Sequence, residues 1–311
     1  MKVSGEVGTR LMALDTATLY YRAFHALPTT LTAPDGMPVN AVRGTLDMIA
    51  ALIQEFEPDV VVAAWDEQWR PAWRTALVPQ YKAHRVAAGT YNAEDVPAEL
   101  APQIPLVRQA LEHLGIAVMG VADQEADDVL GALVRSWAGE SFVVSGDRDL
   151  FQLADDERQS AVVYIGAGIK KLEVVTDAWL ADKYQLAPGQ YRDFAALRGD
   201  ASDGLPGVPG IGDKTAAKLL GQFESIEGIL SAAEQSHRAL TPRTCANLIA
   251  AKDYLRAVRS VIAVGEKVDL VAPSQQAPCD VQAFEDLAER WGLGKPAERL
   301  LSTMLGLADR G

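Results

Sequence analysis

The chain has 311 residues, 49% of them hydrophobic, so it can bury a substantial core and is neither disordered nor fibrous. Its 29 basic and 42 acidic residues give a formal net charge of -13, which argues against binding nucleic acid or an anionic membrane through bulk electrostatics. The two cysteines, Cys245 and Cys279, are too few for a disulfide framework and indicate a reducing compartment. Because we find neither a membrane-length apolar run nor a signal peptide, we expect a soluble, cytoplasmic protein.

Short apolar runs alternate with helical stretches over the first two thirds of the chain. Four runs have the pattern of buried strands: Leu11 to Leu14, Val60 to Ala64, Ile116 to Met119 and Ser141 to Val144. Helical periodicity lies between them, at Ala41 to Phe56, Ala101 to Leu114 and Ala126 to Trp137. This alternation predicts an α/β fold with a parallel sheet and helices on both faces, and ligands of such sheets bind at the carboxyl ends of the strands.

From about Pro188 the pattern changes to short helical segments interrupted by glycine and proline, most sharply at 204–212. We therefore divide the chain into an α/β domain at 1–187 and a smaller α-helical module at 188–311. Within the first domain, residues 87–97 lack clear periodicity, as expected of a loop or arch. The tail from Glu266 predicts a helix packed back on the first domain, and docking of a partner is the alternative.

Carboxylates stand where the predicted strands end and at two later turns. They form five groups in chain order: Asp15; Asp66; Glu125, Asp127 and Asp128; Asp147 and Asp149; Asp200 and Asp203. Any one of them could simply cap a helix or turn, but the ordered series favours a shared site. Nine acids at one sheet edge would repel one another unless cations lay among them, and hard oxygen ligands favour Mg²⁺ or Mn²⁺. A metal site would account for much of the negative charge, which then no longer excludes nucleic acid.

A tight glycine turn opens a predicted helix at Gly207, Gly210 and Gly212, and Lys214 and Thr215 follow in its first turn. Free backbone N–H groups at such a helix start fit a phosphate. The segment matches neither a Walker A loop nor a dinucleotide fingerprint. It therefore favours a helix-hairpin-helix that binds a DNA backbone, with a plain turn between packed helices as the alternative.

A locally basic stretch with interleaved aromatic residues follows the second predicted strand. It contains Arg74, Tyr81, Lys82 and Arg85, and a further aromatic residue, Tyr21, follows the first strand. This combination can bind phosphates and stack on unpaired bases. The alternative is a solvated basic face whose aromatic residues pack inward.

Taken together, these motifs resemble the bacterial 5′-nuclease and flap endonuclease family, which includes the N-terminal nuclease domain of DNA polymerase I. The resemblance rests on Asp15, Asp66, Tyr-Lys-Ala-His-Arg at 81–85, Glu-Ala-Asp-Asp at 125–128, Ser-Gly-Asp-Arg-Asp at 145–149 and the acidic and glycine-rich run at 199–212. It covers about residues 10–265 and implies a stand-alone, PIN-like nuclease domain with a helical arch at about 70–100. Thr16, Glu67 and Gly204 depart from the family pattern of Gly, an Ala-type residue and Asn.

The resemblance also implies cofactors and residue roles. Two or more Mg²⁺ or Mn²⁺ ions would be held, the first by Asp15, Asp66, Glu125 and Asp127, the second by Asp147, Asp149, Asp200 and Asp203, with Asp128 near both. Lys82 and Arg85 would contact the scissile phosphate, and Tyr21 would stack on a base beside the cut. A K⁺ ion would lie at the helix-hairpin-helix.

The implied activity is structure-specific 5′-3′ exonuclease and 5′-flap endonuclease cleavage of DNA in replication and repair. Its substrates would be 5′ flaps, nicks and gaps, cleaved by a monomer that works beside a DNA polymerase or ligase. A pair of divalent ions can activate a water and stabilise both oxygens of the displacement. The rival functions are a PIN-type ribonuclease, a DNA-junction binding protein without turnover and a nucleotide-binding enzyme that uses the glycine turn.

Overall fold

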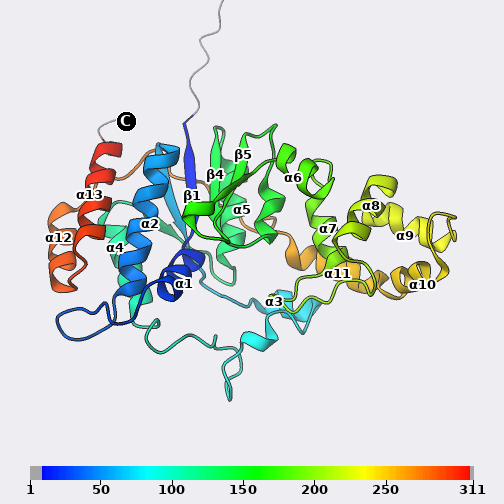
Figure 1. Cartoon of the computed structure of the whole chain (residues 1–311), viewed down its shortest axis with the longest axis horizontal. Helices are drawn as coiled ribbons and strands as arrows, with labels where there is room; N and C mark the ends of the chain where they lie inside the picture. The colour runs from blue at the N-terminus through cyan, green and yellow to red at the C-terminus, as the bar shows by residue number, and fades with distance from the viewer. Residues whose placement is uncertain (1–8, 309–311) are drawn as a thin grey trace, which may run out of the picture.

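The computed structural model describes residues 9–308, so both ends of the predicted domains, 1–8 and 309–311, lie outside the described residues. A six-stranded sheet in the order β3-β2-β1-β4-β5-β6 forms its centre (Figure 1). The strands are β1 (Leu11–Asp15), β2 (Val60–Ala64), β3 (Ala117–Met119), β4 (Ser141–Ser145), β5 (Ser160–Tyr164) and β6 (Glu173–Val175). The first five strands are all parallel to one another in the sheet, and β6 pairs antiparallel with β5. The four predicted strands are confirmed, and β5 and β6 were not predicted.

Alternate residues of the strands enter two separate apolar cores, because successive side chains point to opposite faces of a sheet. Leu11 and Ala13 of β1 pack with α5, whereas Met12 and Leu14 pack with α2 and α4. The helices around the sheet are α1 (Thr16–Ala26), α2 (Asn40–Phe56), α4 (Gln103–His113), α5 (Ala126–Ser136) and α6 (Asp177–Tyr184). The predicted parallel sheet with helices on both faces is therefore confirmed.

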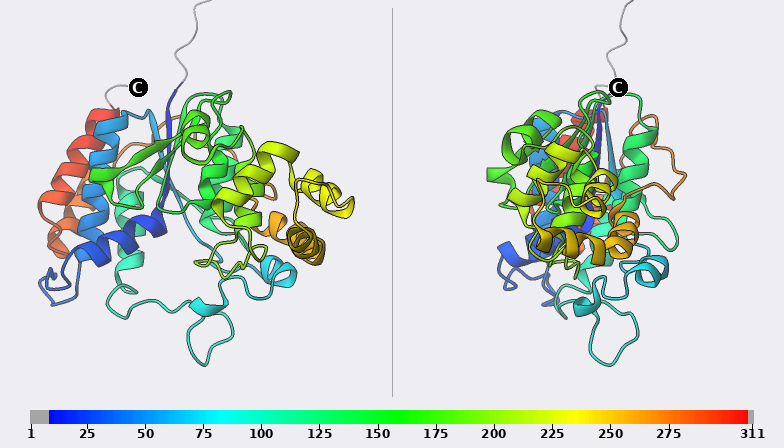
Figure 2. Two further views of the ribbon diagram at one scale, coloured as in Figure 1. Left: turned by 45° about the vertical axis from the view of Figure 1, so that its right-hand side comes forward. Right: turned by 90° about the vertical axis from the view of Figure 1, so that its right-hand side faces the viewer.

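The short helices expected after Pro188 form a module at one end of the molecule (Figure 2). They are α7 (Tyr191–Arg198), α8 (Asp213–Phe223), α9 (Ile226–Glu234), α10 (Pro242–Ala250) and α11 (Lys252–Ile262). Phe194 of α7 and Val258 of α11 belong to the same apolar core as Val129 of α5. The module is thus joined to the α5 side of the sheet by continuous packing.

The last two helices, α12 (Val281–Arg290) and α13 (Lys295–Ala308), return to the α/β domain (Figure 1). Phe284 and Leu300 share a core with Leu46 of α2, and Arg299 pairs with Asp47 at 2.9 Å. The predicted boundary at 188 assigned these two helices to the α-helical module. In the structure they pack on the α/β domain instead. α13 covers the outer side of α2 and α12 packs against α4, as the pattern of the tail suggested.

The segment at 70–100 differs from the expected helical arch. It contains one short helix, α3 (Ala72–Leu77), and a 3-10 turn at Ala83–Arg85, and the rest of it is largely irregular. Proline explains the short helix, because the helical conformation is disfavoured at the residue before Pro79.

Among residues 9–308, no helix is long and apolar enough to cross a membrane.

The segment that follows α11 approaches α5 so closely that two glycines are required. A Cβ atom on Gly131 of α5 would lie 2.7 Å from the carbonyl oxygen of Val264. Gly265 has a φ of +72°, and a Cβ there would lie 2.5 Å from the backbone nitrogen of Ala132. We call residues 261–268 the joint, because they connect the helical module to α5.

The close approach at the joint makes a stability prediction. Gly131→Ala should lower the free energy of unfolding by about 1–3 kcal/mol, because the clash with Val264 exceeds the gain in helix propensity. Gly221→Ala is the matched control, since Gly221 is also helical and a Cβ on it meets nothing within 4 Å. The control should be neutral or stabilising by up to ~1 kcal/mol in denaturant titrations. Equal effects of the two substitutions would contradict the packing described.

Candidate active site

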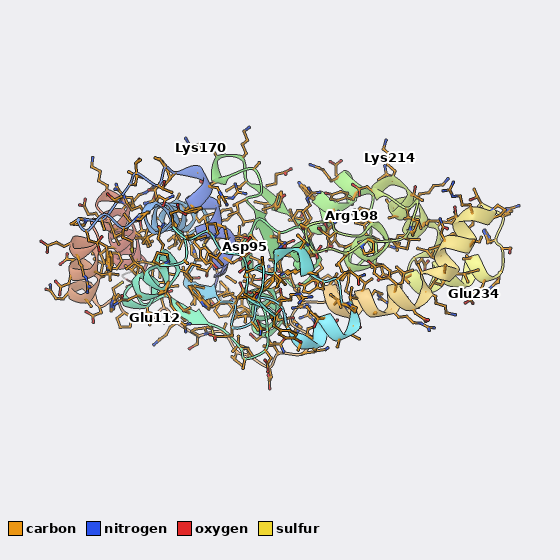
Figure 3. All side chains as sticks on the ribbon, turned by 90° about the horizontal axis from the view of Figure 1, so that it is seen from below. Asp95, Glu112, Lys170, Arg198, Lys214 and Glu234 are labelled. Carbon is orange, nitrogen blue, oxygen red and sulfur yellow. The ribbon has the colours of Figure 1, made fainter. Side chains whose placement is uncertain are left out.

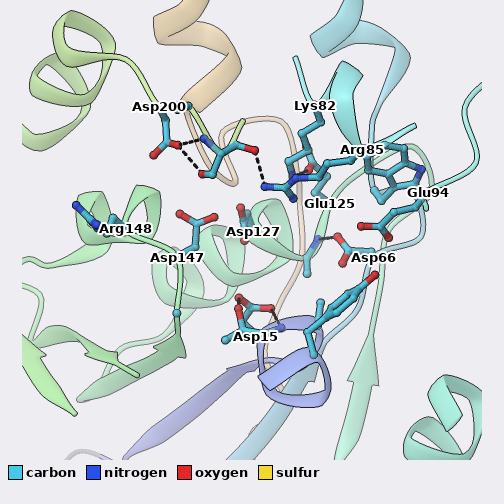
Figure 4. Close-up of a pocket in the computed structure, with 18 of the residues that line it drawn as sticks. Asp15, Asp66, Lys82, Arg85, Glu94, Glu125, Asp127, Asp147, Arg148 and Asp200 are labelled. Atoms are coloured by element: carbon cyan, nitrogen blue, oxygen red, sulfur yellow. Dashed lines mark hydrogen bonds and ion pairs between the residues drawn. The ribbon is translucent and has the colours of Figure 1, made fainter. Parts of the chain in front are cut away.

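A cavity of about 620 Å³ opens at the carboxyl edge of the parallel strands (Figure 4). Six of the nine predicted acids line it: Asp15, Asp66, Glu125, Asp127, Asp147 and Asp200. Asp149 and Asp203 are buried beside it, and the charge of Asp203 raises the pKa of both Asp147 and Asp149. The structure therefore brings together eight of the nine acids that the strand ends and turns predicted.

Several of these acids fix the start of a helix and face the cavity at the same time. Asp15 ends β1, accepts a hydrogen bond from the Thr18 backbone at 3.0 Å and so caps α1. Its other oxygen accepts from the Ser145 hydroxyl at 2.6 Å, which ties β1 to β4. Asp66 accepts from the Ala126 backbone at 2.8 Å, at the first residue of α5. Capping and a shared site are thus not exclusive alternatives here.

The acids after β4 are less completely satisfied. Asp147 accepts the backbone N–H of Asp149 at 2.8 Å, which closes a turn soon after β4. The Oδ1 atom of Asp149 is buried and has no hydrogen-bond partner among the described residues. An unpartnered buried carboxylate oxygen costs free energy unless a cation or a donor satisfies it. This atom therefore fits the ligand set of a bound cation.

Burial and mutual repulsion shift the titration of these groups. Burial raises the pKa of Asp66 to about 6, and burial together with the charge of Asp203 raises that of Asp147 to about 6. The pKa values of Asp127 and Asp149 lie well above their ordinary value, mainly through burial and then through the charge of Asp147. Without added cations, ionising the whole cluster is unfavourable.

Two basic residues of the segment at 70–100 line the cavity. The ammonium group of Lys82 pairs with Glu125, and Arg85 pairs with Asp203 at 2.9 Å. Tyr21 also lines the cavity. Lys82 and Arg85 therefore rest on predicted metal ligands and neutralise part of their charge.

Three expectations do not fit the structure. Arg74 is 2% exposed and pairs with Glu125 and Asp128, so it cannot contact DNA from this position. Tyr81 is 4% exposed and donates to Glu125 at 3.0 Å, which also removes it from DNA contact. Asp128 does not line the cavity, because its carboxylate accepts hydrogen bonds from Arg74 and from the Gly265 backbone. In each case a long-range ion pair or hydrogen bond, which spacing cannot show, directs the side chain inward.

The predicted hairpin joins α7 to α8 beside the cavity. Gly207 and Gly210 have φ values of +65° and +82°, and a Cβ on Gly207 would lie 2.4 Å from the Arg198 carbonyl oxygen. Gly212 precedes α8, and Lys214 is exposed in the first turn of this helix with Thr215 next to it. Seen from below, Arg198 and Lys214 lie on the same side of Asp95, toward the helical module (Figure 3).

Cavity-lining residues that the sequence analysis missed include Glu94, Arg148 and Arg198. Burial raises the pKa of Glu94, which lies beside Tyr21 and Arg85. Nothing in its irregular segment signals this position. Arg198 ends α7 and is followed by Gly199 and Asp200. Its position two residues before a predicted metal ligand is the one feature of the sequence that could have placed it at the cavity.

The structure thus combines an α/β sheet, a carboxylate-lined cavity at the strand ends and a glycine hairpin beside that cavity. Family models describe residues 10–185 as the N-terminal resolvase-like domain of 5′-3′ exonuclease and residues 186–285 as its C-terminal SAM fold. The "5'-3' exonuclease" of Streptomyces coelicolor is 48% identical over 300 residues, which are 94% of this chain and 99% of the relative. That of Mycobacterium tuberculosis is 41% identical, covering 93% of this chain and 96% of the relative.

DNA polymerase I of Bacillus subtilis is 36% identical over 229 residues, 73% of this chain and 25% of the polymerase. The chain belongs to the 5′-3′ exonuclease family, as its motifs predicted, and is therefore a nuclease that acts on DNA.

Two solved structures show the same fold at low sequence identity. A bacteriophage T5 D15 flap endonuclease complex with DNA and metal ions has a TM-score of 0.63 and 17% identity, covering 96% of this chain and 99% of that chain. The catalytic core of Rad2 with DNA substrate has a TM-score of 0.61 and 15% identity, and the match covers 97% of this chain and 92% of that chain.

The shifted carboxyls predict an unusual dependence of stability on pH. Because Asp66 and Asp147 have raised pKa values in the folded state, the metal-free folded protein binds more protons than the unfolded chain between about pH 4 and 6. Their contribution to stability therefore falls as the pH rises through this range, and Asp149, whose pKa is also raised in the folded state, adds to the loss.

We accordingly expect Asp149→Asn to be more stable than wild type at pH 8 in chelator, by at least ~1 kcal/mol or a Tm increase of about 2–4 °C. The difference should shrink at pH 5 and on addition of Mn²⁺. Asp253→Asn, on a side chain 98% exposed, is the control and should leave Tm unchanged. Thermal melts in which Asp149→Asn is less stable than wild type at pH 8 would contradict the repulsion.

Proposed function

We propose that this nuclease hydrolyses DNA phosphodiesters near single-strand/duplex junctions, 5′ flaps, nicks and gaps, with two or more divalent ions in the acidic cavity. The observation that carries the proposal is the buried, unpartnered Oδ1 atom of Asp149 within a cluster of carboxyls whose pKa values are raised. Such a cluster is stabilised by hard cations with oxygen preference, which favours Mg²⁺ or Mn²⁺. The T5 flap endonuclease, solved with DNA and metal ions, supports both the cofactor and the substrate class.

We assign the ligands as the acids at the cavity and directly beside it: Asp15, Asp66, Glu125, Asp127, Asp147, Asp149, Asp200 and Asp203. Among residues 9–308, no three of these groups already surround one point closely. We therefore propose that some of these acids would hold the ions through water and not directly. Bound divalent ions supply a water of lowered pKa and stabilise the attacking and leaving oxygens.

The chain's own cations have a separate role in this proposal. Lys82 and Arg85 lie on acids that would hold the ions, and with those acids neutralised both side chains would be available to face the scissile phosphate. Two fixed positive charges there stabilise the charge that develops during hydrolysis. Tyr21, on the same cavity wall, is available to stack on the base next to the cut.

The hairpin supplies the grip on the duplex. Gly210 and Gly212 are exposed and allow a phosphate to approach the backbone, and Lys214 with Thr215 offers further donors. Gly207, expected to contact DNA, is instead buried against the backbone of Arg198 and shapes the turn. The family resemblance adds a K⁺ ion at this hairpin. A monomeric state, a cytoplasmic location and a DNA polymerase or ligase as partner belong to the same proposal.

The decisive experiment uses a 5′-flap DNA labelled at the 5′ end or at the 3′ end, with Mg²⁺, Mn²⁺ or chelator. We expect metal-dependent cuts near the junction by wild type and by Asp253→Asn, and loss of most turnover in Asp149→Asn with DNA affinity largely retained. A flap that is bound but left intact with either metal would favour a junction-binding protein. Preferential cleavage of the matching RNA flap would favour a ribonuclease.

A second prediction concerns the cavity lysine. Lys82→Ala should lower the single-turnover rate by about 10²–10³ because a charge that stabilises the transition state is lost. Mn²⁺ binding should persist, since Lys82 competes with the ions for Glu125. Lys183→Ala is the control, since it removes a surface pair with Glu173 and a cation–π contact with Trp179, neither of which lines the cavity. A normal single-turnover rate in Lys82→Ala would refute the assigned role.

A further inference from the structure

Arg74 is a buried cation that the hydrolytic mechanism does not use, and it connects three separate parts of the chain. It belongs to α3, which leads into the irregular segment. Its guanidinium contacts Glu125 and Asp128 at the start of α5. It also donates to the carbonyl oxygens of Val261 and Ala263, where α11 ends in the joint.

Every N–H group of this guanidinium has an acceptor. Nε donates to Val261 at 2.8 Å, and Nη1 donates to Glu125 and, at 2.7 Å, to Asp128. Nη2 donates to Asp128 at 3.0 Å and to the Ala263 carbonyl at 3.3 Å. An arginine has five donors in a rigid plane, whereas a lysine has three at one point, so only arginine can make this set of contacts.

The two carboxylates differ in what else they contact. Asp128 faces the joint, where it also accepts the Gly265 N–H at 3.2 Å. Glu125 faces the cavity, where Lys82 contacts its other oxygen, Oε1. Arg74 therefore holds one oxygen of a cavity carboxylate from behind while its remaining donors hold the end of α11.

We propose that Arg74 is a positioning residue that fixes the Glu125 carboxylate in the cavity and keeps it in register with the helical module. The inference rests on the proposed function, since Glu125 is assigned there as a metal ligand. The planar guanidinium of Arg74 donates hydrogen bonds both to the backbone at the end of α11 and to the Glu125 carboxylate, so it fixes one relative to the other. DNA held by the module is thereby kept at a fixed position relative to the acids.

The chain offers a matched control for this role. Arg135 of α5 donates to the carbonyl oxygens of Val264, Gly265 and Val268, so it holds the same joint. Within residues 9–308, Arg135 forms no ion pair with a carboxylate. Its loss should weaken the joint without disturbing Glu125.

The test compares Arg74→Met, Arg135→Met, Glu125→Gln and the double variant Arg74→Met/Glu125→Gln. Three quantities are measured: Tm, Mn²⁺ affinity without DNA by electron paramagnetic resonance, and the single-turnover rate on the 5′ flap. We expect lower Tm in both arginine variants, but a tenfold or greater loss of Mn²⁺ affinity and rate only in Arg74→Met. In the double variant, Arg74→Met should add less than about threefold to the effect of Glu125→Gln, because coupled residues are not additive.

Equal Mn²⁺ affinities and rates in the two arginine variants, or independent effects in the double variant, would overturn the positioning role. Arg74→Gln keeps part of the hydrogen bonding and replaces Arg74→Met if the latter does not fold, with the same expected order. A wild type that neither binds Mn²⁺ nor cleaves the flap would instead overturn the proposed function. The two failures are therefore distinguishable.

Discussion

Repulsion among carboxylates at one edge of the sheet is the constraint on which the site depends. Parallel strands end at the same edge, so residues that follow β1, β2 and β4 meet there although they are far apart in the sequence. Burial prevents water from screening them, and the pKa values of Asp66 and Asp147 rise to about 6 as a result. A protein that keeps such a cluster needs positive charge beside it, which metal ions, substrate-facing cations and buried arginines can each supply.

The internal cations divide into two groups by position. Lys82 and Arg85 lie at the cavity, where they contact acids that bound ions would neutralise, so their present pairing is compatible with a later role at the phosphate. Arg74 lies behind the cavity with its donors fully used, and it serves the framework. Arg74 and Arg85 thus belong to the same basic stretch but differ in position: Arg74 is buried in the framework, whereas Arg85 lines the cavity.

The sequence predicted the strands that carry the acids, because buried parallel strands give continuous apolar runs. It did not predict β5, although β5 is as long as β1, β2 and β4, nor β6, an antiparallel edge strand of three residues. Strand ends placed most acids correctly. The inward turn of Asp128 and Arg74 depends on a pair 54 positions apart, which local spacing cannot reveal, and Glu94 reaches the cavity from a segment without periodicity.

The central claim, that the acidic cluster is unfavourable alone and is completed by divalent ions, is tested most directly by counting the protons that binding releases. Mn²⁺ is titrated calorimetrically into the metal-free protein at pH 6, without DNA, in two buffers of different ionisation enthalpy. Because carboxyls with a pKa of about 6 must ionise to bind an ion, the account predicts saturable binding with release of at least about one proton per protein, from Asp66 and Asp147 with a further share from Asp127 and Asp149. Binding without proton release, or no binding at all, would contradict it.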